Sequence, residues 1–109
     1  MKIDIICPLY NASRYIIDLN NSFLMQENVI LNKIRYVLTE SNDNTKEIMD
    51  NANIQYKLIK KSEFSHSLVR EKEAMESDAD IVVYVTQDVV ITDKLWLYNL
   101  TKDINDEVV

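Results

Sequence analysis

An acidic residue directly follows the most apolar segment of the chain. Residues 81–85 (IVVYV) are continuously apolar, and the polar residues Thr86, Gln87 and Asp88 come next. Such a run is typical of a strand that is covered on both faces in the middle of a parallel sheet. Ligands of open α/β sheets bind at the carboxyl ends of these strands. Asp88 is therefore placed to hold a divalent cation or a sugar hydroxyl.

An aromatic and polar segment follows the first apolar run, residues 2–7. Pro8 is expected to end that strand and fix a turn, which leaves Tyr10 and Asn11 at the same edge of the sheet. The Tyr10 ring can stack on a base or pack against a sugar, and Asn11 can both donate and accept hydrogen bonds. A turn that caps the next helix explains these residues equally well, and the residues alone leave both interpretations open.

The polar residues 39–45 (TESNDNT) follow a second apolar run, residues 34–39. Glu40 and Asp43 in this segment can recognise a base or a ribose by hydrogen bonding. The segment can also form an Asx turn with a helix cap. Without further support, the residues favour the turn.

A histidine and an arginine lie four residues apart at 66 and 70. If a helix begins near Ser65, His66 and Arg70 share one of its faces. The helix N-terminus adds partial positive charge, so this face can hold a diphosphate. As an isolated pair, however, the two residues are more simply a surface histidine beside an arginine that pairs with Glu73 or Glu76.

Alternating apolar runs and helical patterns indicate the elements that position these residues. The runs at 2–7, 34–39, 54–59 and 80–86 predict strands. The expected helix caps are Ser13, Asn44 or Thr45, Ser65 or Ser67, and Thr92 or Asp93. The inward positions would be Ile16, Leu19, Phe23, Ile48, Met49, Leu68, Val69, Met75, Leu95, Trp96, Leu100 and Ile104, with the last helix ending near Asn105. Strands alternating with helices predict an α/β fold with a mainly parallel sheet.

Composition excludes several classes of function. The chain has 109 residues, enough for one domain, and its net charge of −6 argues against binding to a nucleic-acid backbone. It carries neither a signal-peptide pattern nor an apolar stretch of membrane-spanning length, which predicts a cytoplasmic protein. Cys7 is the single cysteine and His66 the single histidine. An internal disulfide is therefore impossible, a zinc site is disfavoured, and Cys7 is expected to be a buried structural thiol.

The chain contains no glycine. Glycine-rich phosphate loops of the dinucleotide-binding and P-loop kinds are therefore absent. Left-handed turn positions must fall to Asn and Asp, which the chain has in abundance.

The order of these motifs resembles the N-terminal half of an inverting family-2 glycosyltransferase with the GT-A fold, particularly the rhamnosyltransferase-like branch. The resemblance spans nearly the whole chain, and its last two motifs are the most specific. The matching segments are Pro8-Leu9-Tyr10-Asn11, Ser22 with Gln26, Ser41-Asn42-Asp43-Asn44-Thr45 with Asn44 in place of glycine, Phe64-Ser65-His66-Ser67-Leu68-Val69-Arg70, and Thr86-Gln87-Asp88 with Asp93-Lys94-Leu95-Trp96-Leu97.

The resemblance implies a Rossmann-like three-layer sandwich with strand order 3-2-1-4, the nucleotide-binding half of a GT-A fold. Residues 1–109 would be the nucleotide-sugar-binding part of a truncated domain. The implied donor-binding residues are Pro8, Tyr10, Asn11, Glu40, Asp43, His66, Arg70, Gln87 and Asp88. Asp88 occupies the last position of the family's Asp-x-Asp metal motif, with Thr86 at the first, and would bind Mg²⁺ or Mn²⁺.

The implied activity is inverting transfer of a hexosyl or rhamnosyl group from a nucleotide-diphospho-sugar to a glycan or lipid-linked acceptor. The family's catalytic base is a carboxylate that we expect beyond Val109, so the chain alone would bind the donor without catalysing transfer. It would also expose a sheet edge and an apolar patch that favour self-association. The full-length protein would be cytoplasmic, at the inner face of the membrane.

Other classes of α/β protein remain as alternatives. One is a non-catalytic module that binds a nucleotide or another protein, such as a degenerate transferase half or a flavodoxin-like signalling domain. A signalling domain of that kind normally carries an acidic cluster after its first strand, where this chain has Pro8-Leu9-Tyr10. A nucleotidyltransferase is another alternative, but its usual glycine-rich stretch is lacking.

Overall fold

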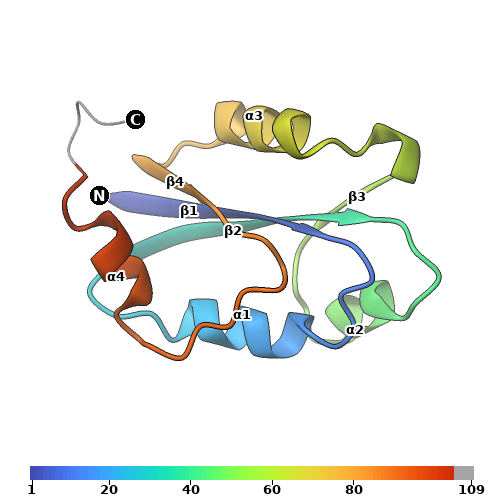
Figure 1. Ribbon diagram of the computed structural model, residues 1–109, viewed down its shortest axis with the longest axis horizontal. Helices are drawn as coiled ribbons and strands as arrows, with labels where there is room; N and C mark the ends of the chain where they lie inside the picture. The colour runs from blue at the N-terminus through green and yellow to red at the C-terminus, as the bar shows by residue number, and fades with distance from the viewer. Residues whose placement is uncertain (105–109) are drawn as a thin grey trace.

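The computed structural model describes residues 1–104, in which helices cover both faces of one sheet (Figure 1). The strands are β1 (Lys2–Leu9), β2 (Ile30–Thr39), β3 (Lys57–Ile59) and β4 (Ile81–Tyr84). The helices are α1 (Ile16–Leu24), α2 (Thr45–Asn51), α3 (His66–Glu76) and α4 (Trp96–Thr101), with a 3-10 turn η1 (Lys61–Glu63) before α3. No helix in this part of the chain is long and apolar enough to span a membrane.

The four strands form a parallel sheet in the order β3-β2-β1-β4. Helices α1, α2 and α4 lie on one face of the sheet and α3 lies on the other (Figure 1). This confirms the predicted α/β fold, the three layers and the strand order 3-2-1-4. Within residues 1–104, β3 and β4 are the edge strands, and self-association through such an edge stays a prediction.

The apolar core lies between the sheet and the layer of α1, α2 and α4. Alternate residues of β1, from Ile3 to Leu9, enter this core, as the two-residue period of a strand requires. Phe23 of α1 and Leu97 of α4 are completely buried there. Cys7 is buried in the same layer, and this burial raises the pKa of its thiol to about 12. Cys7 is therefore an unreactive structural residue, as predicted.

The opposite face of the sheet carries a buried acid. The Asp4 carboxylate is fully buried and accepts hydrogen bonds from Asn32 Nδ2 at 2.8 Å, the Lys33 N–H at 3.0 Å and Arg35 Nε at 3.1 Å. Ser77 Oγ, just after α3, donates a further bond at 2.5 Å. Desolvation, the largest single influence, raises the pKa of Asp4, but the hydrogen bonds and the Arg35 charge together hold it below its ordinary value.

Helix α3 is docked on this face largely by ion pairs. Glu73 is nearly buried and contacts Arg35 Nη1 at 3.2 Å and Lys57 Nζ at 2.8 Å, while Lys57 also pairs with Glu76. Val69 is buried as predicted, but Leu68 and Met75 are 63% and 80% exposed. The prediction that Leu68 and Met75 face inward is wrong, because the polar side chain of Glu73 occupies the sheet-facing position instead.

The ends of the strands differ from the predicted ranges. Strand β2 begins at Ile30 instead of 34, and β3 covers only Lys57–Ile59 of the predicted 54–59. The fourth strand is also shorter, because β4 ends at Tyr84 and leaves Thr86 in the following loop. Pro8 does not end β1, which stays paired with β2 as far as Leu9. Pairing of β1 with β4 has already stopped at Ile6, so the missing N–H of Pro8 costs no bond to β4.

Two helices also begin or end elsewhere than predicted. Helix α1 starts at Ile16 with Tyr15 as its cap, because the Ala12 carbonyl accepts the first turn bonds and the Ser13 N–H donates to Asp43. Helix α4 ends at Thr101, before the predicted Asn105, which lies outside the described residues. In α4, Leu97 is the buried leucine and Leu100 is 52% exposed, contrary to the predicted face.

Asparagines take the left-handed positions in this glycine-free chain. Asn11, Asn28 and Asn53 have φ angles of 50°, 62° and 58°. Asparagine tolerates this region better than other residues with a Cβ. The expectation that such turns fall to Asn is confirmed.

Candidate functional site

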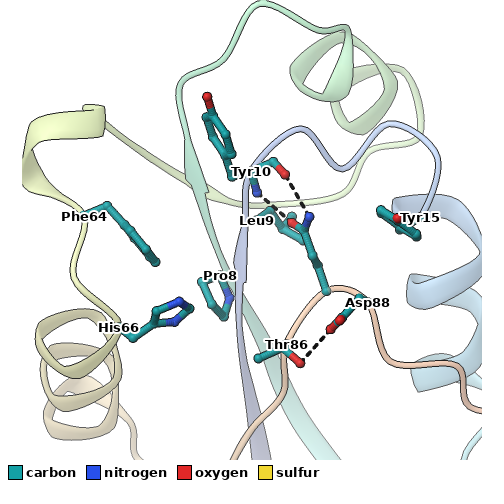
Figure 2. Close-up of a pocket in the computed structure, with 9 residues that line it drawn as sticks. Pro8, Leu9, Tyr10, Tyr15, Phe64, His66, Thr86 and Asp88 are labelled. Carbon is teal, nitrogen blue, oxygen red and sulfur yellow. Dashed lines mark hydrogen bonds between the residues drawn. The ribbon is translucent and has the colours of Figure 1, made fainter.

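A cavity of about 440 Å³ opens at the carboxyl ends of β1 and β4, where the segment leading into α3 also arrives (Figure 2). Three segments that are far apart in the sequence line it. Its lining residues are Pro8, Leu9, Tyr10, Tyr15, Phe64, His66, Thr86, Gln87 and Asp88. Five of the nine predicted donor-binding residues thus meet around one cavity: Pro8, Tyr10, His66, Gln87 and Asp88.

Gln87 joins the loop after β4 to the end of β1. Its Oε1 accepts a hydrogen bond from the Tyr10 N–H at 2.7 Å, and its Nε2 donates to the Tyr10 carbonyl at 2.8 Å (Figure 2). Both polar atoms of the Gln87 side-chain amide therefore bond to the backbone of Tyr10. The role of Gln87 in this structure is to fix the distance between the two loops that form the cavity.

The Tyr10 side chain is 39% exposed at the rim of the cavity. Lys61 Nζ lies 5.2 Å from the centroid of its ring, within the range of a cation–π contact. Because Gln87 holds only the Tyr10 backbone, much of the ring surface remains accessible. An aromatic face of this kind can stack on a planar base.

Asp88 is an exposed carboxylate in the loop after β4. Its Oδ1 accepts a hydrogen bond from Thr86 Oγ1 at 3.0 Å (Figure 2). Among residues 1–104, no three His, Cys, Asp or Glu side chains gather closely enough to hold a metal ion by themselves. Any metal at Asp88 would therefore need ligand or water oxygens to complete its coordination.

His66 is the first residue of α3, and its ring lies beside the cavity between Phe64 and Pro8 (Figure 2). The Phe64 ring meets the imidazole edge-on, with centroids 4.7 Å apart at 75°. His66 Nδ1 is 2.8 Å from the hydroxyl of Tyr84, the last residue of β4. The predicted start of this helix near Ser65 is confirmed, although Ser65 makes no side-chain cap bond.

Arg70 shares the His66 face of α3 but does not line the cavity. Its Cζ lies 5.8 Å from the centroid of the Tyr84 ring. The alternative in which Arg70 pairs with Glu73 or Glu76 is wrong for the described residues, because those acids instead pair with Arg35 and Lys57.

Asp43 forms a brace between the loops that follow β1 and β2. Its carboxylate accepts hydrogen bonds from Ser41 Oγ at 2.8 Å, from the Thr45 N–H at 3.2 Å and hydroxyl at 2.7 Å, and from the Ser13 N–H at 3.3 Å. Thr45 Oγ1 in turn accepts a bond from the Ala12 N–H at 3.0 Å. Partial burial raises the pKa of Asp43, but these hydrogen bonds outweigh it and bring the pKa to about 2. The segment 39–45 is thus a turn and helix cap.

Asn11 and Glu40 are exposed and, like Asp43, lie outside the cavity lining. Glu40 donates its backbone N–H to the Ile59 carbonyl at 2.9 Å. The donor-binding roles of these three residues stay predictions.

Several residues at this site were not among the predicted ones. Leu9, Tyr15, Phe64 and Thr86 line the cavity, and the Tyr84 hydroxyl contacts His66. Phe64 and Thr86 belong to the motifs quoted above, so their motif position was a usable signal. Tyr15 lies just before the first residue of α1, and no pattern distinguishes it from a surface tyrosine.

No family model and no curated protein sequence matches the chain. Solved structures with a similar fold do match it. Glucosyl-3-phosphoglycerate synthase from Mycobacterium tuberculosis, in complex with uridine diphosphate (UDP), matches with a TM-score of 0.69 and 14% identity over 94% of this chain. TarS of S. aureus (residues 1–349) matches with a TM-score of 0.67 and 23% identity, also over 94% of this chain.

The chain has the fold of the nucleotide-binding half of a GT-A glycosyltransferase. It spans 39% of the synthase chain and 32% of the TarS chain. Other structures of the synthase hold Mn²⁺ with UDP-glucose and phosphoglyceric acid, or Mg²⁺ with UDP. The GT-A half described here therefore resembles a part of enzymes that are larger than itself.

Proposed function

We propose that this chain is the donor-binding part, residues 1–109, of an inverting family-2 glycosyltransferase of the rhamnosyltransferase-like branch, and that its cavity binds a nucleotide-diphospho-sugar. One observation carries the proposal. Three segments with the family's motif residues, at 8–10, 64–66 and 86–88, line one cavity at the carboxyl ends of β1 and β4. A solved structure with the same fold contains UDP.

Each part of the cavity suits a different part of such a donor. The Tyr10 ring offers an exposed aromatic face for the base. His66 supplies a hydrogen-bond donor for the diphosphate at the N-terminus of α3, where the helix dipole also favours negative charge. Asp88 and Thr86 lie on the other side, where an acid and a hydroxyl can hold a metal or a sugar hydroxyl.

The residues around Asp88 fit a divalent cation that the ligand brings with it. Mg²⁺ commonly binds through one or two carboxylates together with phosphate oxygens and water. Asp88 is exposed and has a hydroxyl neighbour at 3.0 Å, so it can supply one such ligand without leaving a buried charge unpaired. When bound, the metal would neutralise the charge that develops on the leaving diphosphate.

Transfer also needs a base that deprotonates the acceptor hydroxyl. In the described part of the chain, Asp88 is the one carboxylate that lines the cavity. We propose that Asp88 serves donor binding and that the base belongs to the protein beyond Val109. The acceptor would be a glycan or a lipid-linked saccharide.

Calorimetric titration of UDP, dTDP and GDP, with and without Mn²⁺, tests this function. At least one diphosphate is expected to bind, and Mn²⁺ is expected to strengthen its binding. Asp88→Asn should remove the effect of Mn²⁺, weakening metal-assisted binding at least about tenfold, or about 1.4 kcal/mol. Asp103→Asn is the matched control, because Asp103 is an exposed acid outside the cavity lining. No binding of any diphosphate would favour the competing hypothesis of a protein-interaction module.

A further inference from the structure

Tyr84 contacts His66 and Arg70, which share one face of α3. It ends β4, and its neighbours Val83 and Val85 belong to the apolar core on the other face of the sheet. The alternation of a strand therefore directs Tyr84 toward α3. Its hydroxyl lies 2.8 Å from His66 Nδ1, and Arg70 Cζ lies 5.8 Å from its ring centroid.

We propose that Tyr84 is a positioning residue for the donor site: its hydroxyl donates to His66 Nδ1 and so keeps a proton on Nε2, which then donates to an anionic oxygen of the bound ligand. This inference rests on the proposed function for the identity of the ligand. The hydrogen-bonded state of His66 belongs to the free protein and can be measured without any ligand.

The two nitrogens of the His66 imidazole have different partners. A neutral histidine has one N–H donor and one acceptor nitrogen, and a partner at one nitrogen decides which is which. Tyr84 occupies Nδ1, so Nε2 is the nitrogen that remains for the cavity. If the tyrosine donates its proton, Nε2 must carry the hydrogen. A protonated imidazole carries it as well, so Nε2 is a donor in both charge states.

The surroundings of Tyr84 keep its hydroxyl available as a donor. Desolvation is the main influence on this side chain and raises the pKa of its phenol above the ordinary value. The hydroxyl therefore remains protonated at neutral pH. Phe64 contacts the other side of the imidazole edge-on at a centroid distance of 4.7 Å. Together, Phe64 and Tyr84 restrict rotation of the His66 ring, so the donor is oriented before a ligand arrives.

The ring and the hydroxyl of Tyr84 have separable tasks. Arg70 lies over the ring, in a cation–π contact that does not need the hydroxyl. Tyr84→Phe removes the contact with His66 and leaves the Arg70 contact in place. Tyr56→Phe is a matched control, because Tyr56 also uses its hydroxyl in one hydrogen bond, to Asp50 at 2.6 Å, away from the cavity lining.

The first experiment is nitrogen-detected NMR of the histidine ring in ¹⁵N-labelled protein without ligand. His66 is the single histidine, so the signal needs no assignment among several. We expect the wild type and Tyr56→Phe to show the Nε2–H tautomer at a pH where the ring is neutral, and Tyr84→Phe to show a mixture of tautomers. An Nδ1–H tautomer in the wild type, or an unchanged tautomer in Tyr84→Phe, would overturn the inference. The wild-type part of this experiment does not depend on whether any variant folds.

The second experiment compares the affinities of UDP and uridine by calorimetry. Loss of the fixed orientation of one donor in Tyr84→Phe should weaken UDP binding about three- to tenfold, the net contribution of one ordinary hydrogen bond, and leave uridine unaffected. Equal weakening of both ligands would overturn the inference, since it would indicate a general structural effect. If wild-type protein bound no UDP, the proposed function would fail, while the tautomer result would still decide the role of Tyr84.

Discussion

The side-chain amide of Gln87 and the backbone of Tyr10 form a reciprocal pair of hydrogen bonds, at 2.7 Å and 2.8 Å. The two residues are 77 positions apart in the sequence. Pairing of β1 with β4 stops at Ile6 and Tyr84, so the amide continues the connection beyond the end of the ladder. The shape of the cavity therefore depends on a side chain whose family motif position suggests a ligand contact.

Substitution of Gln87 tests this structural role. Gln87→Leu keeps the size of the side chain and removes both hydrogen bonds, so it should lower the free energy of unfolding by about 1–2 kcal/mol. Urea denaturation followed by the fluorescence of Trp96, the single tryptophan, measures the change. The control is Gln55→Leu, at an exposed position outside this cavity. Equal stabilities of the two variants would show that the amide pair contributes nothing to stability.

Because of Asp43, the free energy of unfolding should depend on pH. Its pKa is about 2 in the folded protein, against 3.8 ordinarily. Because the folded value is the lower one, the stabilisation is complete above about pH 4 and disappears as the pH falls through 2. Asp43→Asn should therefore be less stable than the wild type by about 1–2 kcal/mol at pH 7.

The same measurement repeated at lower pH supplies the sharper test. The difference in unfolding free energy between Asp43→Asn and the wild type should shrink steadily between pH 4 and pH 2. A difference that stayed constant over this range would mean that the carboxylate charge of Asp43 is not what holds the loops after β1 and β2 together.

The ion pairs under α3 predict unequal effects of two cations. Arg35 is 11% exposed and faces both Asp4 and Glu73, whereas Lys57 is 47% exposed. Arg35→Met leaves the buried Asp4 carboxylate without a charge partner and takes one of two cationic partners from Glu73, which costs about 3–5 kcal/mol. Lys57→Met should cost less than about 1 kcal/mol, because Glu73 keeps Arg35 as its partner and water can solvate the exposed carboxylate of Glu76. Urea denaturation of the two variants measures both, and equal losses would contradict this account of how α3 is docked.

Those buried charges also explain where sequence patterns failed. The spacing of Leu68 and Met75 predicted an apolar inward face for α3. Its inward face instead contains Glu73, whose partners Arg35 and Lys57 lie on β2 and β3. Partners so distant in the sequence leave no local signal, since an acid on a helix ordinarily indicates a solvent-facing position.

The sheet and one side of the site were predictable because local sequence patterns indicate them. The apolar run at 81–85 and the alternation of strands with helices are local patterns, and they predicted the parallel sheet and the place of Asp88. The strand order was implied by the family resemblance. The side-chain contacts that hold the loops in place join residues far apart in the sequence, so local patterns did not predict them. Gln87 and Asp43 bond to backbone groups of the loop after β1, and Tyr84 reaches His66 on another layer. These contacts depend on the packed structure.

We propose that one cavity binds a nucleoside diphosphate together with a metal at Asp88. Paramagnetic broadening by Mn²⁺ tests it most directly, by NMR of the wild-type chain at a low ratio of metal to protein, with and without UDP. With UDP present, Mn²⁺ should broaden the ring signals of His66 and the backbone signals of Gln87 and Asp88, and leave those of Leu100 in α4 unchanged. Broadening that was the same with and without UDP, or that spared His66 and Asp88, would contradict the account.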